Sequence, residues 1–220
     1  MGDRLVLYIG EKNISSWSMR AFVCMKLKGL EFEERTISLP GDKDRRQRVE
    51  ISPTGKVPVL HHGRRVIPDS LAILEYLEET FPAPAYPGLW PSDPDERAHA
   101  RWLAATMHSS FPHLRESMSF NLCFLPERPP ATAAALADAA QMLGLFESVL
   151  GGKVGRGAFL FGPFGGVDAM FAPAVVRLTA FDVPTASTPL AARYLAAVLE
   201  HPAVRAWMEP ARALAPRASY

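Results

Sequence analysis

Two short stretches decide the fold of this 220-residue chain: residues 13–20, NISSWSMR, and residues 52–60, SPTGKVPVL, which the pair Asp69-Ser70 follows closely. The first stretch comes directly after an apolar segment and places hydroxyl groups and free backbone N–H groups at the start of a predicted helix. The second places an X-Pro bond, and then an acid beside a hydroxyl, where an extended peptide can be held. Together they indicate a binding site for a peptide that carries a thiol.

A β-α-β unit surrounds the first stretch. Residues 4–9 are apolar and β-branched and predict a buried strand, and residues 16–27 carry apolar side chains at helical spacing. Gly29 is placed to end this helix as its C′ residue, and residues 31–37 alternate as a half-exposed strand does. Because a helix joins the two strands, we expect them to be parallel, with a right-handed crossover.

The second stretch leads into a hairpin and a helix. Residues 57–61 and 64–67 predict two short strands around a His-Gly turn at residues 62–63. A helix opens at residues 69–70 and ends before Pro82, so the residues themselves predict a small α/β layer of order β-α-β-β-β-α.

The rest of the chain is helical in character, after a stretch rich in proline. Helices of a bundle are predicted at residues 98–113 (with a break at Pro112), 131–150, 167–181, 190–199 and 203–207. The segment 167–181 is strongly apolar and is expected at the centre of the second core. The predicted organisation is an α/β domain at residues 1–81, a linker at 82–93 and an all-α domain at 94–220.

Composition and net charge limit the kinds of partner that the protein is expected to bind. The net charge is +1, with 48% hydrophobic and 21% charged residues, so nothing favours nucleic acid or an anionic membrane as a partner. The basic run at residues 43–48 is explained by a solvated loop. Cys24 and Cys123 lie far apart, which fits a reducing compartment, and Cys24 is expected in core packing. Residues 5–9 are too few for a signal peptide or a membrane span, and we expect a cytoplasmic protein.

The start of the first helix suits a thiolate. A helix N-terminus carries partial positive charge, and such surroundings bring thiol pKa values from about 8.5 down to between about 3.5 and 7.5. Ser15 or Ser16 can donate a hydrogen bond to the sulfur of a bound thiol without acting as a nucleophile. Simple capping of the helix by serine is the ordinary alternative.

The second stretch suits the rest of a peptide. Val57-Pro58 is a candidate for a cis bond, which would leave the N–H and C=O of Val57 free to pair with an extended chain. At the next helix start, backbone N–H groups favour a carboxylate while Asp69, beside Ser70, can receive an ammonium group. A site for a thiolate, a peptide and an amino-acid group suits γ-glutamyl-cysteinyl-glycine, although an ordinary turn and an ordinary N-cap would explain each piece alone.

The order of these motifs resembles that of the glutathione transferases, in a bacterial-type chain nearest to the zeta class. Residues 15–18, Ser-Ser-Trp-Ser, are similar to the Ser-Ser-Cys-Ser motif of that class, with Trp17 in place of the cysteine. Further matches are the Val57-Pro58 dipeptide, the helix at residues 69–77, the capping box at 159–168 and the tail at 201–204. The resemblance implies a thioredoxin-like N-terminal domain of β-α-β-α-β-β-α type followed by a helical-bundle C-terminal domain.

One departure from the family falls in the capping box. Gly165 or Gly166 stands where the family has Ser or Thr at the helix start. Asp168 is still expected to turn back to the chain from the third helical position, but the reciprocal side-chain bond is lost.

The resemblance also implies residue roles, with glutathione as co-substrate and no metal. Ser15, and then Ser16, are the candidates for stabilising the thiolate. The expected glutathione-binding residues are Ser15, Trp17, Lys56, Val57, Asp69 and Ser70, with Lys56 toward the glycyl carboxylate. Met107, His108 and Phe111 are candidates for the electrophile pocket, and each fits the bundle core or surface equally well.

The implied activity is attack of the glutathione thiolate on a small, mainly apolar electrophile, in a homodimeric detoxification enzyme. The alternatives are a non-catalytic scaffold of the same fold and a glutathione-dependent isomerase. The joint presence of Ser15, Val57-Pro58 and Asp69-Ser70 argues against a decayed site. A thiol-transfer oxidoreductase needs a cysteine near Ser15, where this sequence has none.

Overall fold

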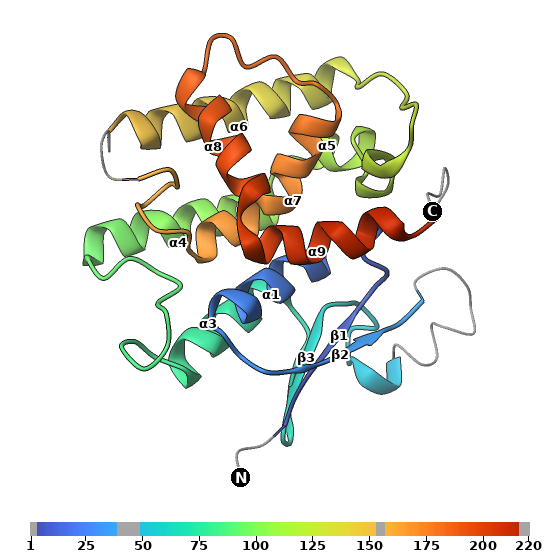
Figure 1. The fold of residues 1–220 in the computed structure, drawn as a ribbon, viewed down its shortest axis with the longest axis vertical. Helices are drawn as coiled ribbons and strands as arrows, with labels where there is room; N and C mark the ends of the chain where they lie inside the picture. Colours follow the sequence, from blue (N-terminus) through green and yellow to red (C-terminus); the bar gives the residue numbers. More distant parts are fainter. Residues whose placement is uncertain (1–3, 39–48, 153–156, 216–220) are drawn as a thin grey trace.

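A four-stranded sheet forms one end of the molecule in the computed structural model, which describes residues 4–38, 49–152 and 157–215 (Figure 1). Its strands are β1 (Leu5–Ile9), β2 (Glu33–Thr36), β3 (Val59–His62) and β4 (Arg65–Ile67), in the spatial order β2-β1-β3-β4. Strand β1 runs parallel to β2, as predicted, and antiparallel to β3. The turn between β3 and β4 lies one residue later than predicted, because His62 pairs with Arg65 across the hairpin.

Two helices cover one face of the sheet. Helix α1 (Ser16–Leu27) ends before Gly29, whose φ of 67° confirms it as the predicted left-handed terminator. Helix α3 (Ser70–Thr80) begins and ends where the sequence predicts. The residues at 49–51 are helical, whereas the basic run at residues 43–48 lies outside the described part of the chain. The α/β layer that the sequence predicts is therefore confirmed.

The second half is a helical bundle, as predicted, with some different boundaries. Its elements are α4 (Pro94–Ser109), α5 (Pro112–Ser117), the 3-10 helix η1 (Phe120–Phe124), α6 (Ala133–Gly151), α7 (Gly166–Ala180), α8 (Pro189–Glu200) and α9 (Pro202–Ala213). The predicted helix at 98–113 begins four residues earlier, and the predicted break at Pro112 separates α4 from α5. Residues 81–93 contain neither helix nor strand, and the exact domain boundaries stay a prediction.

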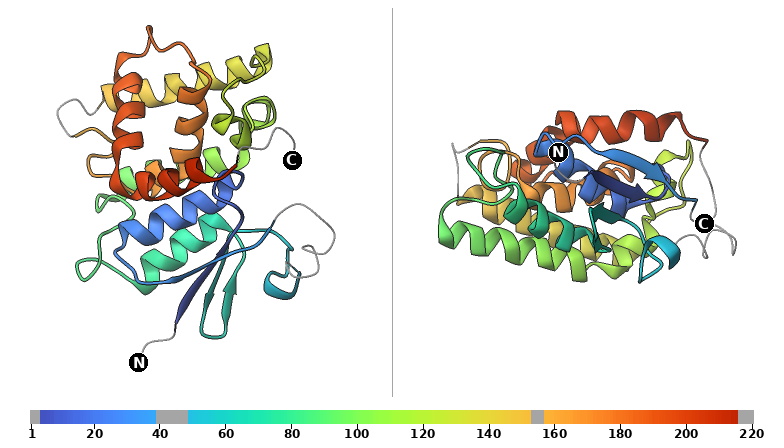
Figure 2. Two further views of the ribbon diagram at one scale, coloured as in Figure 1. Left: turned by 45° about the vertical axis from the view of Figure 1, so that its right-hand side comes forward. Right: turned by 90° about the horizontal axis from the view of Figure 1, so that it is seen from below.

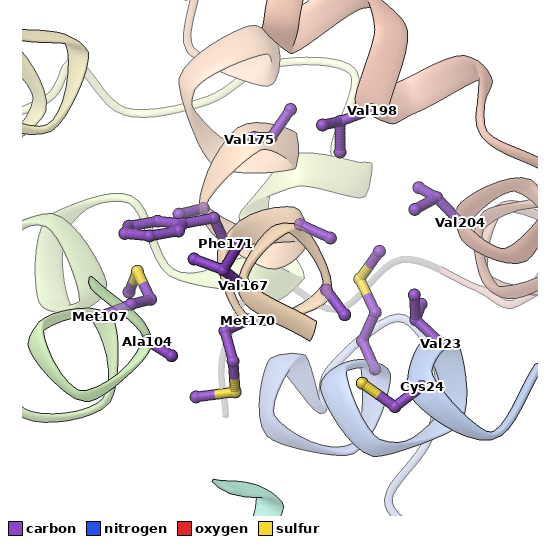
Figure 3. Packing of buried hydrophobic residues seen from close by; sticks show 14 of the residues in the cluster. Val23, Cys24, Ala104, Met107, Val167, Met170, Phe171, Val175, Val198 and Val204 are labelled. Carbon is purple, nitrogen blue, oxygen red and sulfur yellow. The ribbon is translucent and has the colours of Figure 1, made fainter. Parts of the chain in front are cut away.

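Helices α1 and α3 lie between the sheet and the bundle (Figure 2). One cluster of buried apolar residues runs through both halves, and α7 lies at its centre. Around α7, Figure 3 shows side chains from α1 (Val23, Cys24), from α4 (Ala104, Met107) and from the last two helices (Val198, Val204). Cys24 is fully buried there, which confirms its expected place in the core.

The start of α7 explains why glycine replaces the family's hydroxyl residue. A Cβ on Gly165 would lie 2.9 Å from the carbonyl oxygen of Leu89, so the close approach of these two segments leaves no room for a side chain. The carboxylate of Asp168 turns back, as predicted, and accepts from the N–H groups of Gly165 (2.8 Å) and Leu160 (3.2 Å). Burial raises the pKa of Asp168 to about 6.

Within the described ranges, α6 is the one helix with the length and apolar composition of a membrane span. Its buried residues face neighbouring helices of the bundle, as those of a core helix do.

Candidate functional site

A cavity of about 520 Å³ opens between the α/β layer and the bundle. It is lined by Ile14, Ser15, Ser16, Trp17, Gly55, Lys56, Val57, Pro58, Pro68, Asp69, Ser70 and His108. Every residue predicted for the site lies in this set except Met107 and Phe111. The volume is in the usual range for a small-molecule site, about 300–1,000 Å³.

Ser15 is held at the start of α1 by a network of hydroxyl and backbone groups. It is the N-cap residue, and its Oγ accepts from the N–H of Ser18 at 3.4 Å. Ser15 Oγ donates to Ser18 Oγ at 2.8 Å, and Ser18 Oγ also accepts from the N–H of Gly10 at 3.2 Å. Ser18 was not among the predicted site residues, although it completes the Ser-Ser-x-Ser motif. It joins the end of the strand to the start of the helix and so fixes Ser15 at the cavity wall.

Ser16 is tied to the bundle by a buried arginine of α7. Nη2 of Arg177 donates to Ser16 Oγ at 3.0 Å, and its Nε donates to the carbonyl of Met118 at 2.8 Å. The guanidinium is buried, which lowers the pKa of Arg177 to about 10, so it stays charged at neutral pH. Sequence reasoning missed Arg177; the available signal was a single cation in the otherwise apolar segment 167–181.

Trp17 lies between two further arginines and a histidine. Its ring centroid is 4.2 Å from the guanidinium carbon of Arg20, 5.4 Å from that of Arg115, and 5.2 Å from the ring centroid of His108. Contacts of this kind between a cation and an aromatic face are attractive. Positive charges therefore lie behind the part of the cavity wall that Trp17 forms. The exchange of cysteine for tryptophan at this position did not by itself indicate these charges.

Arg20 is a buried cation whose charge is compensated by few neighbouring groups. Its side chain is 1% exposed, and its Nε and Nη1 have no hydrogen-bond partner within the described residues. Burial, with the charges of Arg177 and Arg115, lowers the pKa of Arg20 to about 9, and Asp69 opposes this shift. At neutral pH the group remains protonated and adds to the positive field behind the start of α1.

The segment before β3 forms the opposite wall. The Val57-Pro58 bond is cis, as predicted, and Gly55 takes a φ of 64°, which a glycine adopts without strain. The exposed side chain of Lys56 reaches the rim of the cavity. Val57 therefore lies in this wall of the cavity, next to the cation of Lys56 at the rim.

The third wall is the start of α3. Asp69 is the N-cap, and its Oδ1 accepts from the N–H groups of Leu71 and Ala72, both at 2.9 Å. Its other oxygen lies 3.4 Å from Nε2 of His108. The next hydroxyl, Ser70 Oγ, is buried and has no partner in the described part of the chain. An unpaired buried hydroxyl beside a cavity is expected to bind a group that arrives with the ligand.

Two of the three residues expected at the electrophile pocket do not line the cavity. Met107 and Phe111 are 0% and 2% exposed and belong to the hydrophobic core (Figure 3 shows Met107 beside Phe171). His108, in contrast, faces the cavity and packs edge-on against Trp17. Burial lowers the pKa of His108; Asp69 raises it, and Arg20 and Arg115 lower it further.

Over residues 4–38, 49–152 and 157–215, no three His, Cys, Asp or Glu side chains are grouped so as to hold a metal ion. The expectation of a metal-free site stays a prediction.

Comparisons with known proteins agree with this geometry. Residues 14–80 match the family model of the glutathione S-transferase N-terminal domain, and residues 129–209 match that of the C-terminal domain. A probable glutathione S-transferase, GSTU6, from rice (Oryza sativa subsp. japonica) is 32% identical over 90% of this chain and 81% of its own length. A probable maleylacetoacetate isomerase from Caenorhabditis elegans is 38% identical, over 47% of this chain and 46% of its own length.

Solved structures extend the similarity to the whole fold. A glutathione transferase homologue from Burkholderia GL BGR1, crystallised with bound glutathione, is 31% identical and covers 96% of this chain and 99% of its own, with a TM-score of 0.72. The holo structure of a maleyl pyruvate isomerase, described as a bacterial zeta-class enzyme, is 25% identical and covers 97% and 100%, with a TM-score of 0.71. The chain belongs to the glutathione S-transferase family.

Proposed function

We propose that this protein is a glutathione transferase that binds glutathione in the cavity at the start of α1 and activates its thiol as a thiolate. The observation that carries the proposal is the meeting of three walls around one cavity, each suited to a different part of the tripeptide. The Burkholderia relative, which holds glutathione in its crystal structure, supports the same ligand here.

Each wall has a role in the proposed complex. The hydroxyls of Ser15 and Ser16 face the sulfur, and the backbone of Val57 pairs with the cysteinyl residue. The γ-glutamyl end lies at the start of α3, where Asp69 receives the ammonium and Ser70 the carboxylate. Trp17 packs beside the peptide, and Lys56 receives the glycyl carboxylate at the rim.

The proposed reaction needs no covalent bond to the protein. The glutathione thiol loses its proton to solvent, and the resulting thiolate attacks an electrophilic carbon to form an S–C bond. The leaving group departs with the bonding electrons, or an adjacent carbon takes a proton where a double bond is attacked. The rate enhancement comes from a lowered thiol pKa and from holding the two reactants together.

The electrophile lies beside Trp17 and His108, the predicted pocket residue that does face the cavity. We propose a small, mainly apolar electrophile for this position. Glutathione-dependent isomerisation is a second candidate, because the C. elegans relative is named a probable maleylacetoacetate isomerase. A cytoplasmic homodimer that binds neither membranes nor nucleic acid completes the proposal, on the ground of the family and the net charge of +1.

Retention on immobilised glutathione, followed by a thioether-forming assay with a chlorinated nitroarene, tests the function directly. We expect the wild type to be retained and active, and the Ser15→Ala/Ser16→Ala double variant to lose about a hundredfold or more in kcat/KM. Ser148→Ala, an exposed serine of α6, is the matched control. A wild type that neither binds glutathione nor forms a thioether would favour the scaffold instead, and turnover of a maleyl substrate alone would favour the isomerase.

A further inference from the structure

We propose that Arg177 is a positioning residue for the thiol site: it holds Ser16 as a hydrogen-bond acceptor, so that the Ser16 proton points to the glutathione sulfur, and it places a positive charge behind that bond. The inference rests on the proposed function. It gives the C-terminal half of the chain a part in activating the thiol, through a contact between residues 161 positions apart.

The hydrogen bonds of Arg177 go to neutral oxygens. Its Nε donates to the carbonyl of Met118 at 2.8 Å, its Nη1 to the carbonyl of Pro173 at 3.4 Å, and its Nη2 to Ser16 Oγ at 3.0 Å. No ion pair formed within the described residues includes this guanidinium, which is 3% exposed. Its charge is therefore held in place by backbone groups and is not cancelled by a carboxylate.

The hydrogen bond from Arg177 determines whether the Ser16 hydroxyl can donate its proton to a ligand. A serine hydroxyl has one proton to donate and two lone pairs that accept. Because Arg177 has no acceptor to offer, the hydroxyl can only accept from it, and its single proton stays available for a ligand. Ser15 differs, since its proton goes to Ser18 Oγ. Ser16 is thus already arranged as a donor before glutathione arrives.

The charges around the site favour a bound anion. Arg20 of α1 and Arg115 of α5 lie near enough to Arg177 for their charges to act on one another. Facing them, Asp69 already caps α3 and lies near His108, a titratable group at the end of α4. Further titratable groups near the site are Cys123 of η1, whose burial raises its thiol pKa to about 11, Lys56 at the rim, and Asp138 of α6, whose charge acts on Arg115. Arg20 and Arg177 are buried, so salt screens their charges little and a thiolate bound nearby is attracted to them.

The test is a titration of the thiolate absorbance of bound glutathione, on the full-length protein. In Arg177→Met and in Ser16→Ala, we expect the pKa of the bound thiol to rise by about one unit, a tenfold loss of thiolate below that pKa. Arg177→Lys keeps the charge but not the planar set of donors, so its shift should be smaller. The double variant Ser16→Ala/Arg177→Met should shift little further than either single one, because the two groups act as a unit. Arg193→Met removes an exposed charge of α8 and should leave the thiol pKa unchanged.

The outcomes separate this inference from the proposed function. A wild type that binds glutathione with a lowered thiol pKa, together with unchanged values in Ser16→Ala and Arg177→Met, would show that Arg177 only supports the fold. If Arg177→Met does not fold, Ser16→Ala and Arg177→Lys carry the test, and wild-type thiol pKa values in both overturn the inference. A wild type that does not bind glutathione overturns the proposed function, and the role of Arg177 with it.

Discussion

Helices α1 and α3 both begin at the cavity, and they differ in the side chain that caps them. Ser15 caps α1 with a neutral hydroxyl, the first turn of that helix has no acid, and buried arginines lie behind it. Asp69 caps α3 with a carboxylate, which satisfies two backbone N–H groups and offsets the positive end of that helix. One helix start is therefore free to stabilise an incoming anion, while the other offers an anion of its own to a cation.

The largest expected effect tests the acidic end. In Asp69→Asn the cap is kept, since Asn caps as well as Asp, but the charge that receives the ammonium is lost. We expect glutathione to bind about a hundredfold more weakly, about 2.7 kcal/mol, by calorimetry. Asp69→Ala should bind as weakly and also lose about 1 kcal/mol of unfolding free energy, because its cap is gone. Wild-type affinity in Asp69→Asn would place the ammonium elsewhere.

The second test is at the start of α1, where the hydroxyls depend on one another. Ser18→Ala removes the acceptor for the Gly10 N–H and for the Ser15 hydroxyl, in a buried position. We expect the free energy of unfolding to fall by about 2 kcal/mol, since a buried N–H group is left unpaired. Denaturant unfolding measures this, with Ser109→Ala on the exposed face of α4 as the control. A stability equal to that of the wild type would mean that water replaces the lost hydroxyl.

The two helix starts differ in how much of their structure the sequence predicts. The strand-helix junction, the cis Val57-Pro58 bond and the cap of α3 are local, so motif and spacing predict them. Tertiary packing brings the arginines close to the start of α1. No local sequence pattern predicts which residue a buried cation will contact. The pair Met107 and His108 shows the same limit at one position: adjacent residues of a helix point about 100° apart, so one enters the core and the other the cavity.

Helix α9 shows how packing can override a local signal. The sequence predicts its end at residue 207, before Pro210, yet α9 continues to Ala213. Met208 and Ala211 lie on the same buried face as Val204, and this apolar stripe outweighs the missing N–H of the proline.

The third test contrasts a serine of α3 with Ser18 of α1. Ser70 Oγ is buried without a partner in the described residues, so Ser70→Ala removes an unpaired polar group. We expect unfolding stability to be unchanged or slightly higher, and glutathione affinity to fall about tenfold, because only the bound carboxylate uses this hydroxyl. Calorimetry and denaturant unfolding on the same variant separate the two quantities. A loss of stability without a loss of affinity would contradict the assignment.

The smallest expected effect concerns pH and the histidine between the two helix starts. Burial lowers the pKa of His108 below its ordinary 6.5, so the folded protein binds a proton there less readily than the unfolded chain does. The resulting stability is present above pH 6.5 and is lost as the pH falls through the lowered pKa. A protonated His108 would also compete with the glutathione ammonium for Asp69, which lies 3.4 Å away. In His108→Gln we therefore expect both unfolding stability and glutathione affinity to fall less steeply between pH 7 and pH 5 than in the wild type, with His113→Gln as the exposed control. Parallel pH curves for His108→Gln and the wild type would show that Asp69 meets the ammonium without interference from the bundle.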